Sequence, residues 1–171
     1  YNYDVDWNND GIFDNLTVGG PITHDFGTPG NYTIRIRGTY PAIRFNNGGD
    51  KDKILSVDQW GTIEWTTMEN AFYACSNLSI PATDAPDLSA VTSMAGMFVN
   101  ATNFNSSINH WDVINVTSMV SVFNGASAFN QPLNDWDVDS VTSMVSMFNG
   151  ASAFNQPLGS WEVGNVTTLF H

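Results

Sequence analysis

The sequence is short of several residue types, and each shortage excludes a class of protein. One cysteine stands among 171 residues, so no disulfide can form within the chain. All five lysines and arginines precede residue 54, and residues 54–171 hold ten carboxylates without a lysine or an arginine. This acidic surface predicts that nucleic acids and anionic membranes are not partners. No apolar run reaches the roughly 18 residues of a membrane-spanning helix, so membrane insertion is not expected.

Groups that catalysis would need are also sparse. The histidines His24, His110 and His171 are scattered along the chain, and neither a glycine-rich phosphate loop nor an H-E-x-x-H motif occurs. The single cysteine, Cys75, falls at an apolar position of the pattern described below, which predicts a buried thiol. We therefore expect that the protein is not an enzyme.

The chain does contain a repeat. Residues 111–135 and 136–160 are nearly identical, and a third copy begins at Trp161. Weaker copies begin at Trp60 and Pro86, so residues 54–171 form about five turns of 25–26 residues. A unit this short cannot bury its apolar face alone, which predicts a solenoid in which equivalent side chains of successive turns stack. Because the last turn is incomplete, we expect a part of a longer multidomain chain.

The pattern inside one turn predicts a strand followed by a short helix. Trp136 and Val138 are two residues apart, as on the inner face of a strand. Thr142 or Ser143 is expected to cap a short helix, whose inward side chains would be Met144, Met147 and Phe148. The predicted fold class is therefore α/β: a right-handed leucine-rich-repeat solenoid of parallel strands and short helices, with a small N-terminal β cap.

Polar residues recur in register as well. Asn105, Asn130 and Asn155 each follow a phenylalanine of the repeat. An asparagine amide at such a position can pair with exposed backbone groups and with the asparagine of the next turn. A structural ladder of asparagines is therefore predicted along the stack.

Two motifs resemble BspA-like bacterial leucine-rich repeats. Residues 71–81 are similar to the A-F-x-x-C-x-x-L-x-x-I-P register of that family, and the W-D-V-x-x-V-T-x-M turns resemble related short repeats of bacterial surface proteins. The resemblance implies an extracellular protein of the bacterial cell surface that takes part in adhesion or host contact. It brings no catalytic residues.

Residues 1–53 differ from the repeats, and we expect a β-rich N-terminal cap there. Apolar residues alternate with polar ones at Tyr3 and Val5 and again at Ile34 and Ile36, so at least two strands are predicted. Residues 24–33 are similar to the last hairpin of PKD-like β-sandwich modules. The side chains expected to lead into the first turn are Tyr40, Ile43 and Phe45.

One motif in this cap predicts a calcium site. Residues 6–14 read D-x-N-x-D-G-x-x-D, whose oxygens can wrap one hard cation while Gly11 permits the sharp bend. Thr17 stands where an EF-hand carries its bidentate glutamate, so the motif is closer to the calcium loops of extracellular β-repeats. The predicted ligands are Asp6, Asn8, Asp10, the carbonyl of Ile12, and Asp14. The alternative is an Asx-rich hairpin turn without a metal.

A column of carboxylates predicts the ligand-binding surface. An acidic residue recurs at one outward position of four turns, and strands about 4.8 Å apart would bring these like charges together, which favours a bound cation or basic ligand. The column consists of Asp87, Asp112, Asp137 and Glu162. Varying outward positions are expected to set specificity, and they are Asn109, His110, Ile114, Asn134, Asp135 and Asp139. The alternative is that each aspartate accepts hydrogen bonds within its own turn.

These patterns predict an extracellular, ligand-binding segment of a bacterial surface adhesin. It would recognise a protein, peptide or glycan of another cell surface on the strand face of the solenoid. The competing hypothesis is a structural spacer that projects another adhesin domain. A binding face should expose aromatic or apolar groups, whereas a spacer should be uniformly polar.

Overall fold

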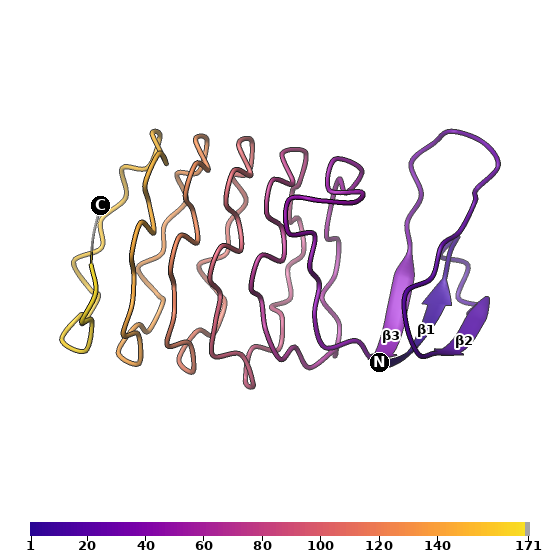
Figure 1. Ribbon diagram of the computed structural model, residues 1–171, viewed down its shortest axis with the longest axis horizontal. Helices are drawn as coiled ribbons and strands as arrows, with labels where there is room; N and C mark the ends of the chain where they lie inside the picture. The colour runs from indigo at the N-terminus through magenta and orange to yellow at the C-terminus, as the bar shows by residue number, and fades with distance from the viewer. Residues whose placement is uncertain (170–171) are drawn as a thin grey trace.

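The computed structural model describes residues 1–169, in which a small sheet precedes a stack of coils (Figure 1). The sheet consists of β1 (Asn2–Asp6), β2 (Asn15–Val18) and β3 (Arg35–Thr39). No helix occurs in this part of the chain. The coils lie side by side along the long axis, and the sheet lies at the N-terminal end of the stack.

β1 is the central strand of the sheet and pairs antiparallel with both β2 and β3. Tyr3 and Val5 of β1 are buried, as their alternation with polar residues predicts. The second predicted strand begins later than expected, because Ile34 lies outside β3 and is 44% exposed. β2 has no counterpart in the prediction, since its sequence Asn-Leu-Thr-Val is short and mostly exposed.

Aromatic side chains connect the sheet to the stack. The ring of Tyr40 lies 5.0 Å from that of Tyr3 in β1 and 6.2 Å from that of Trp65 in the first coil. Phe45 stacks on Phe72 with ring centres 6.4 Å apart. The expected contact of these linking residues with the first turn is confirmed, because the core of the stack is flanked by Tyr40, Ile43 and Phe45.

The stack consists of successive coils with a common register. Coil 1 begins at Trp60, coil 2 at Pro86, coil 3 at Trp111, coil 4 at Trp136 and coil 5 at Trp161. Isolated parallel bridges join neighbouring coils, among them the bridges that connect Ser118 to Ser93 and to Ser143. Neighbouring coils are therefore paired through equivalent residues.

Backbone hydrogen bonds in the segment after Met94 show how neighbouring coils are joined. Alternate N–H groups of coil 2 donate to carbonyls of coil 3 at 2.7–2.9 Å. The intervening N–H groups donate to the carbonyl three residues earlier in their own coil, at 3.1–3.2 Å. The first set is Gly96, Phe98 and Asn100, and the second is Met97, Val99 and Ala101. Each donor thus serves either the next coil or a tight turn.

This alternation explains why the predicted α/β leucine-rich-repeat solenoid with short helices is wrong. In an α-helix the N–H groups donate four residues back within the same segment, so none would remain for the next coil. Gly96 and Asn100 also have positive φ angles of 69° and 54°, and such left-handed residues interrupt a right-handed helix. The segment is therefore a series of tight turns. Its inward-facing Met and Phe residues are spaced as they would be on a helix, which is why the sequence predicted one.

The predicted parallel strand at residues 136–138 is likewise wrong. Trp136 and Val138 are buried at 2% and 1% exposure, so the inward alternation is correct. However, the N–H of Trp136 donates within its own coil to the carbonyl of Leu133 at 3.2 Å. The bridge to the neighbouring coil lies later, at Ser143. An inward spacing of two therefore occurs here without strand pairing.

Polar side chains add rows of hydrogen bonds along the stack. Oδ1 of Asn105 accepts the N–H of Asn130 at 2.9 Å, and Oδ1 of Asn130 accepts that of Asn155 at 2.8 Å. The predicted asparagine ladder is confirmed. Thr142 caps no helix; instead, its N–H and its hydroxyl donate to the carbonyl of Thr117 at 2.8 and 3.1 Å. Both rows connect neighbouring coils.

Columns of phenylalanine fill the interior of the coils. Phe98 and Phe123 stack with ring centres 5.7 Å apart, and Phe104 and Phe129 with centres 5.8 Å apart. All four rings are fully buried, so the predicted stacking of equivalent side chains is confirmed. Burial of one such ring contributes on the order of 2 kcal/mol. Cys75 is also buried, as predicted, and burial raises the pKa of its thiol to about 12.

Replacement of Gly125 by alanine should destabilise the stack. Gly125 has a φ of 72°, and an added Cβ would collide with Oδ1 of Asn100. We expect Gly125→Ala to lower the free energy of unfolding by about 1–3 kcal/mol in urea unfolding followed by circular dichroism. Gly164→Ala is the control, because its Cβ would meet no atom within 4 Å, and a change below about 0.5 kcal/mol is expected. Equal stability of the two variants would contradict this account.

Candidate functional site

The predicted acidic column is exposed, but its aspartates are hydrogen-bonded within their own turns. The column consists of Asp87, Asp112, Asp137 and Glu162, all of which are exposed. Oδ1 of each aspartate accepts the backbone N–H two residues later, at 3.0–3.1 Å. The hydroxyl of Ser89 donates a further bond of 2.6 Å to Asp87, and this bond lowers the pKa of that carboxyl. These hydrogen bonds agree with the alternative prediction, in which each aspartate accepts hydrogen bonds within its own turn.

Three of the predicted specificity residues bond to one another. Oδ1 of Asn109 accepts the N–H of Asp135 at 3.0 Å, and its Nδ2 donates to Oδ2 of Asp135 at 2.6 Å. Nδ2 of Asn134 donates to Oδ1 of the same aspartate at 2.9 Å. These side chains therefore join coil 2 to coil 3.

The remaining predicted specificity residues are more varied. Nε2 of His110 lies 3.3 Å from the carbonyl oxygen of Asp84, and the carbonyl of Asp139 accepts Nδ2 of Asn165 at 2.7 Å. Ile114 is 45% exposed. The predicted surface thus offers one exposed apolar side chain among polar groups that bond to the stack itself.

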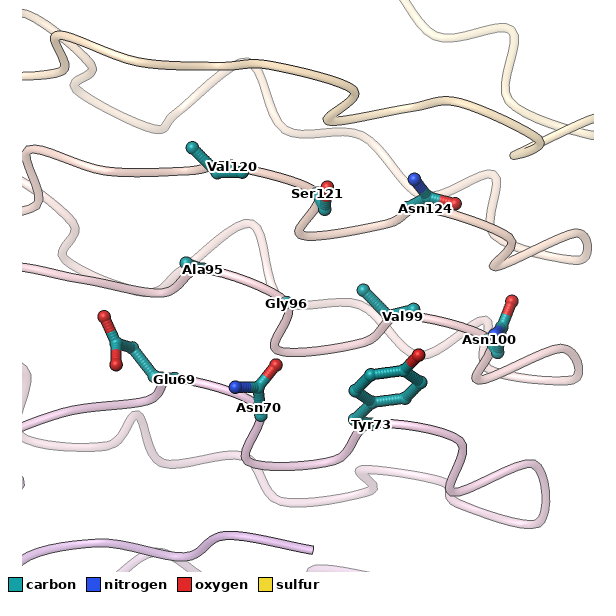
Figure 2. A pocket seen from close by; sticks show the side chains of 10 residues that line it. All are labelled: Glu69, Asn70, Tyr73, Ala95, Gly96, Val99, Asn100, Val120, Ser121 and Asn124. Carbon is teal, nitrogen blue, oxygen red and sulfur yellow. The ribbon is translucent and has the colours of Figure 1, made fainter. Parts of the chain in front are cut away.

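A shallow groove of about 550 Å³ crosses coils 1, 2 and 3 where the backbone donors alternate between coils (Figure 2). Small residues of coil 2 produce the hollow. Ala95 and Gly96 belong to coil 2 and lie between Glu69 of coil 1 and Val120 of coil 3. The side chain of Asn70 contacts Gly96 at the place where a Cβ would stand, and Gly96 also has a positive φ. Glycine is therefore required there.

The groove combines several kinds of side chain. Tyr73, Val99 and Asn124 occupy the same position of three successive coils, and each lines the groove (Figure 2). Glu69 lines its coil 1 end, where Oε1 accepts the hydroxyl of Ser93 at 2.7 Å. An aromatic ring, an apolar chain, an amide and a carboxylate are thus presented together. Such a combination suits recognition of an organic ligand.

The sequence contains a signal for this groove, but it lies outside the outward strand positions from which the binding surface was predicted. Coils 3 and 4 both carry Val-Ser-x-x-Asn at the groove positions, whereas coil 1 carries Glu69, Asn70 and Tyr73 there. Coil 2 departs as well, with Ala95 and Gly96. The departures of coils 1 and 2 from the common repeat coincide with the groove.

The predicted calcium ligands lie in and beside the loop that joins β1 to β2. Asp6 is fully buried, and its Oδ1 and Oδ2 accept the N–H groups of Asn8 and Gly11 at 3.3 and 2.9 Å. Burial alone would raise the pKa of Asp6, but the N–H groups of Gly11, Asn9, Asn8 and Asp10 outweigh it and lower the pKa. The carboxylate is thus held by backbone donors.

The other carboxylates of this loop also accept backbone N–H groups. Oδ1 of Asp10 accepts that of Ile12 at 2.8 Å, and Oδ2 of Asp14 accepts that of Trp7 at 2.9 Å. Within residues 1–169, no group of three or more His, Cys, Asp or Glu side chains is arranged to hold a metal ion. The bonds are those of an Asx-rich turn. An oxygen that accepts one N–H keeps a further lone pair, so calcium binding stays a prediction.

The histidines have separate surroundings. The ring of His24 stacks on that of Trp7 with centres 4.7 Å apart, whereas His110 lies against a carbonyl of coil 1. His171 lies outside the described residues. That the protein is not an enzyme stays a prediction. No helix in the described part of the chain has the length and apolar character needed to cross a bilayer.

Comparison with known families identifies a family of unknown function. Residues 53–171 match the family described as "Mycoplasma protein of unknown function, DUF285". This match covers more than half of the chain, so the chain belongs to that family. No curated protein and no solved structure matches the chain.

The resemblance to BspA-like leucine-rich repeats, with a PKD-like N-terminal segment, is therefore wrong. The family that matches is a different one. In addition, residues 1–169 contain no helix, and their only sheet has three antiparallel strands. The shared W-D-V and Met-Phe spacing reflects inward apolar positions, which coils of another geometry also need.

Loss of Asp84 should weaken the contact between the end and the start of coil 1, in a way that depends on pH. Its carboxylate accepts the N–H of Trp60 at 3.1 Å and that of Gly61 at 2.8 Å. Burial raises the pKa of Asp84, but these donors and the nearby His110 lower it overall, below the ordinary 3.8. The stability it contributes is therefore present above pH 3.8 and is lost as the pH falls through the lower folded-state pKa.

We expect Asp84→Asn to cost about 1 kcal/mol at pH 7 and to lose less stability than the wild type on acidification. Thermal unfolding between pH 7 and pH 2 measures both effects. Asp58→Asn is the control, because Asp58 is an exposed carboxylate close to the same coil. Identical pH profiles of the wild type and Asp84→Asn would show that Asp84 contributes nothing.

Proposed function

We propose that this protein is a ligand-binding segment that holds a protein, peptide or glycan in the groove across coils 1, 2 and 3. The observation that carries the proposal is the groove itself. Its volume of about 550 Å³ falls within the roughly 300–1,000 Å³ of ligand sites, but the groove is a shallow hollow that would contact a ligand along one side only. Three coils supply its walls, so a ligand there would be bound by an extended surface of the stack.

The groove replaces the strand face as the proposed binding surface. Most polar groups of the predicted face are used in bonds within or between coils, as the contacts of Asn109 with Asp135 illustrate. Tyr73 and Val99, by contrast, are partly exposed in the groove. An exposed aromatic and apolar pair favours binding over a uniformly polar spacer.

A structural spacer is the competing function. Such a role needs only the length and rigidity of the stack, and identical coils would serve it as well as varied ones. The departure of coil 1 from the common repeat at Glu69 and Tyr73 favours the binding function. The spacer would project a separate binding domain, and its own surface would take no ligand.

We further propose an extracellular location at a bacterial cell surface, with a partner molecule on another cell. The formal net charge of −12 favours solubility outside the cell, and the single thiol is buried. The acidic stack also repels nucleic acids and anionic membranes. In this setting the segment would contribute to adhesion.

Filling the groove should abolish binding. Ala95→Phe places a ring in the middle of the groove, and we expect it to weaken the signals of the wild-type protein on a peptide and glycan array at least about tenfold. Val145→Phe is the matched control, because Val145 is the equivalent residue of coil 4 and lies outside the groove. Circular dichroism verifies that both variants fold. Unchanged signals with Ala95→Phe would refute the groove, and a silent wild-type array would favour the spacer.

We also propose that the loop of residues 6–14 binds calcium, with a dissociation constant of about 0.1–1 mM, and rigidifies the sheet. About 5 mM calcium should then stabilise the protein by about 1–2 kcal/mol in calorimetry, and Asp10→Asn should remove this effect. Asp25→Asn is the control, because Asp25 accepts the N–H of Gly27 at 2.8 Å in a similar turn outside the loop. No calcium effect on the wild type would leave only the Asx-rich turn.

A further inference from the structure

We infer that the coil 1 end of the groove, at Glu69 and Tyr73, is a subsite for the lysine or arginine side chain of a bound peptide. This inference rests on the proposed function and names the chemical class of its ligand. Three independent observations support it: an oriented carboxylate without an ion-pair partner, an aromatic ring that lines the same end of the groove, and a stack that carries charge of one sign.

The first observation is the carboxylate of Glu69. Its Oε1 accepts the hydroxyl of Ser93 at 2.7 Å, and this bond between coils 1 and 2 orients the group. The ion pairs found in residues 1–169 all lie in the N-terminal part, and they are Arg37 with Asp4, Lys51 with Asp52, and Lys53 with Asp50. Glu69 is therefore oriented by a neutral donor and keeps its charge available to a cationic ligand.

The second observation is the ring of Tyr73. Glu69 and Tyr73 belong to the same coil and line the same groove, and both side chains extend from coil 1 toward coil 2 (Figure 2). A cation near the face of a tyrosine ring is attracted by the ring's quadrupole, and arginine also stacks on such a face. Asn70 lies between the two side chains (Figure 2), so the carboxylate of Glu69 takes the charged end of one lysine or arginine side chain, and the ring of Tyr73 lines the groove for the neighbouring part of the peptide.

The other side chains of the groove suit the rest of a peptide. Val99 and Val120 are apolar walls, against which the methylene chain of lysine or arginine can pack while its charged end reaches Glu69. Asn100 and Asn124 present amides that donate to and accept from a peptide backbone. One extended segment can thus use all three coils.

The third observation is the charge of the whole stack. Residues 54–169 carry ten carboxylates and no lysine or arginine. Their summed field attracts a cationic ligand and repels anionic glycans, phosphorylated peptides and other acidic molecules. A neutral glycan would gain nothing from this field. We therefore commit to a basic peptide as the occupant.

Two capped hexapeptides of glycine and serine test the subsite directly. One carries a central arginine, and the other carries citrulline, which keeps the shape of arginine but has no charge. Titration of the isotope-labelled protein, followed by amide chemical shifts, should show shifts of groove residues of coils 1, 2 and 3. The arginine peptide should bind about tenfold more tightly than the citrulline peptide.

Glu69→Gln tests the residue, because glutamine keeps an acceptor for the hydroxyl of Ser93 but removes the charge. We expect the preference for arginine to fall from about tenfold to nearly none. Glu64→Gln is the matched control, since Glu64 is an exposed glutamate of the same coil that does not line the groove. This variant should keep the preference, and dispersed amide spectra should show that both variants fold.

Three results would overturn the inference. Equal binding of the two peptides would remove the cation subsite but leave a ligand-binding groove. Equal losses in Glu69→Gln and Glu64→Gln would show a diffuse effect of net charge rather than a site. Absence of shifts at groove amides with either peptide would also refute the subsite, while the array with Ala95→Phe decides separately whether the groove binds another ligand.

Discussion

Within the segment of tight turns, every second backbone N–H of one coil donates to a carbonyl of the next coil, and the structure depends on these hydrogen bonds. In coil 2 these bonds run from Gly96, Phe98 and Asn100 at 2.7–2.9 Å. They hold successive coils in register, and this register stacks the phenylalanine rings and aligns the asparagines. Because a lone coil would expose both its apolar face and these donors, each coil is stable only beside its neighbours.

Several features could be predicted from the sequence because they depend only on the repeat register. The stacking of Phe98 on Phe123 and the ladder from Asn105 to Asn130 follow once equivalent residues are neighbours. The local backbone could not be predicted in the same way. Spacings of three and four residues between Met and Phe fit both a helix and a series of tight turns, and the positive φ of Ser121 has no signature in a serine.

In the candidate site, too, the features that depend on the repeat register could be predicted, whereas those that depend on backbone conformation could not. Exposure of Asp112 and Asp137 was predicted from their outward position, but their bonds to nearby N–H groups depend on turn geometry. The groove depends on residue size at one position of three consecutive coils, so it becomes visible only when the coils are placed side by side. Ala95 beside Glu69 and Val120 is an unremarkable residue in a linear sequence, yet it defines the hollow.

The position of the groove in coils 1 to 3 has a physical basis. Most positions of a coil are occupied by the core or by ladders between coils, so only a few outward positions remain for the proposed ligand. Coil 1 is also held by the segment that follows the sheet, because Asn46 and Asn47 donate their N–H groups to the carbonyls of Asn70 and Tyr73 at 3.1 and 3.3 Å. The backbone under Tyr73 is therefore fixed from both sides, by this segment and by coil 2, and such a rigid support lowers the entropic cost of holding a ligand.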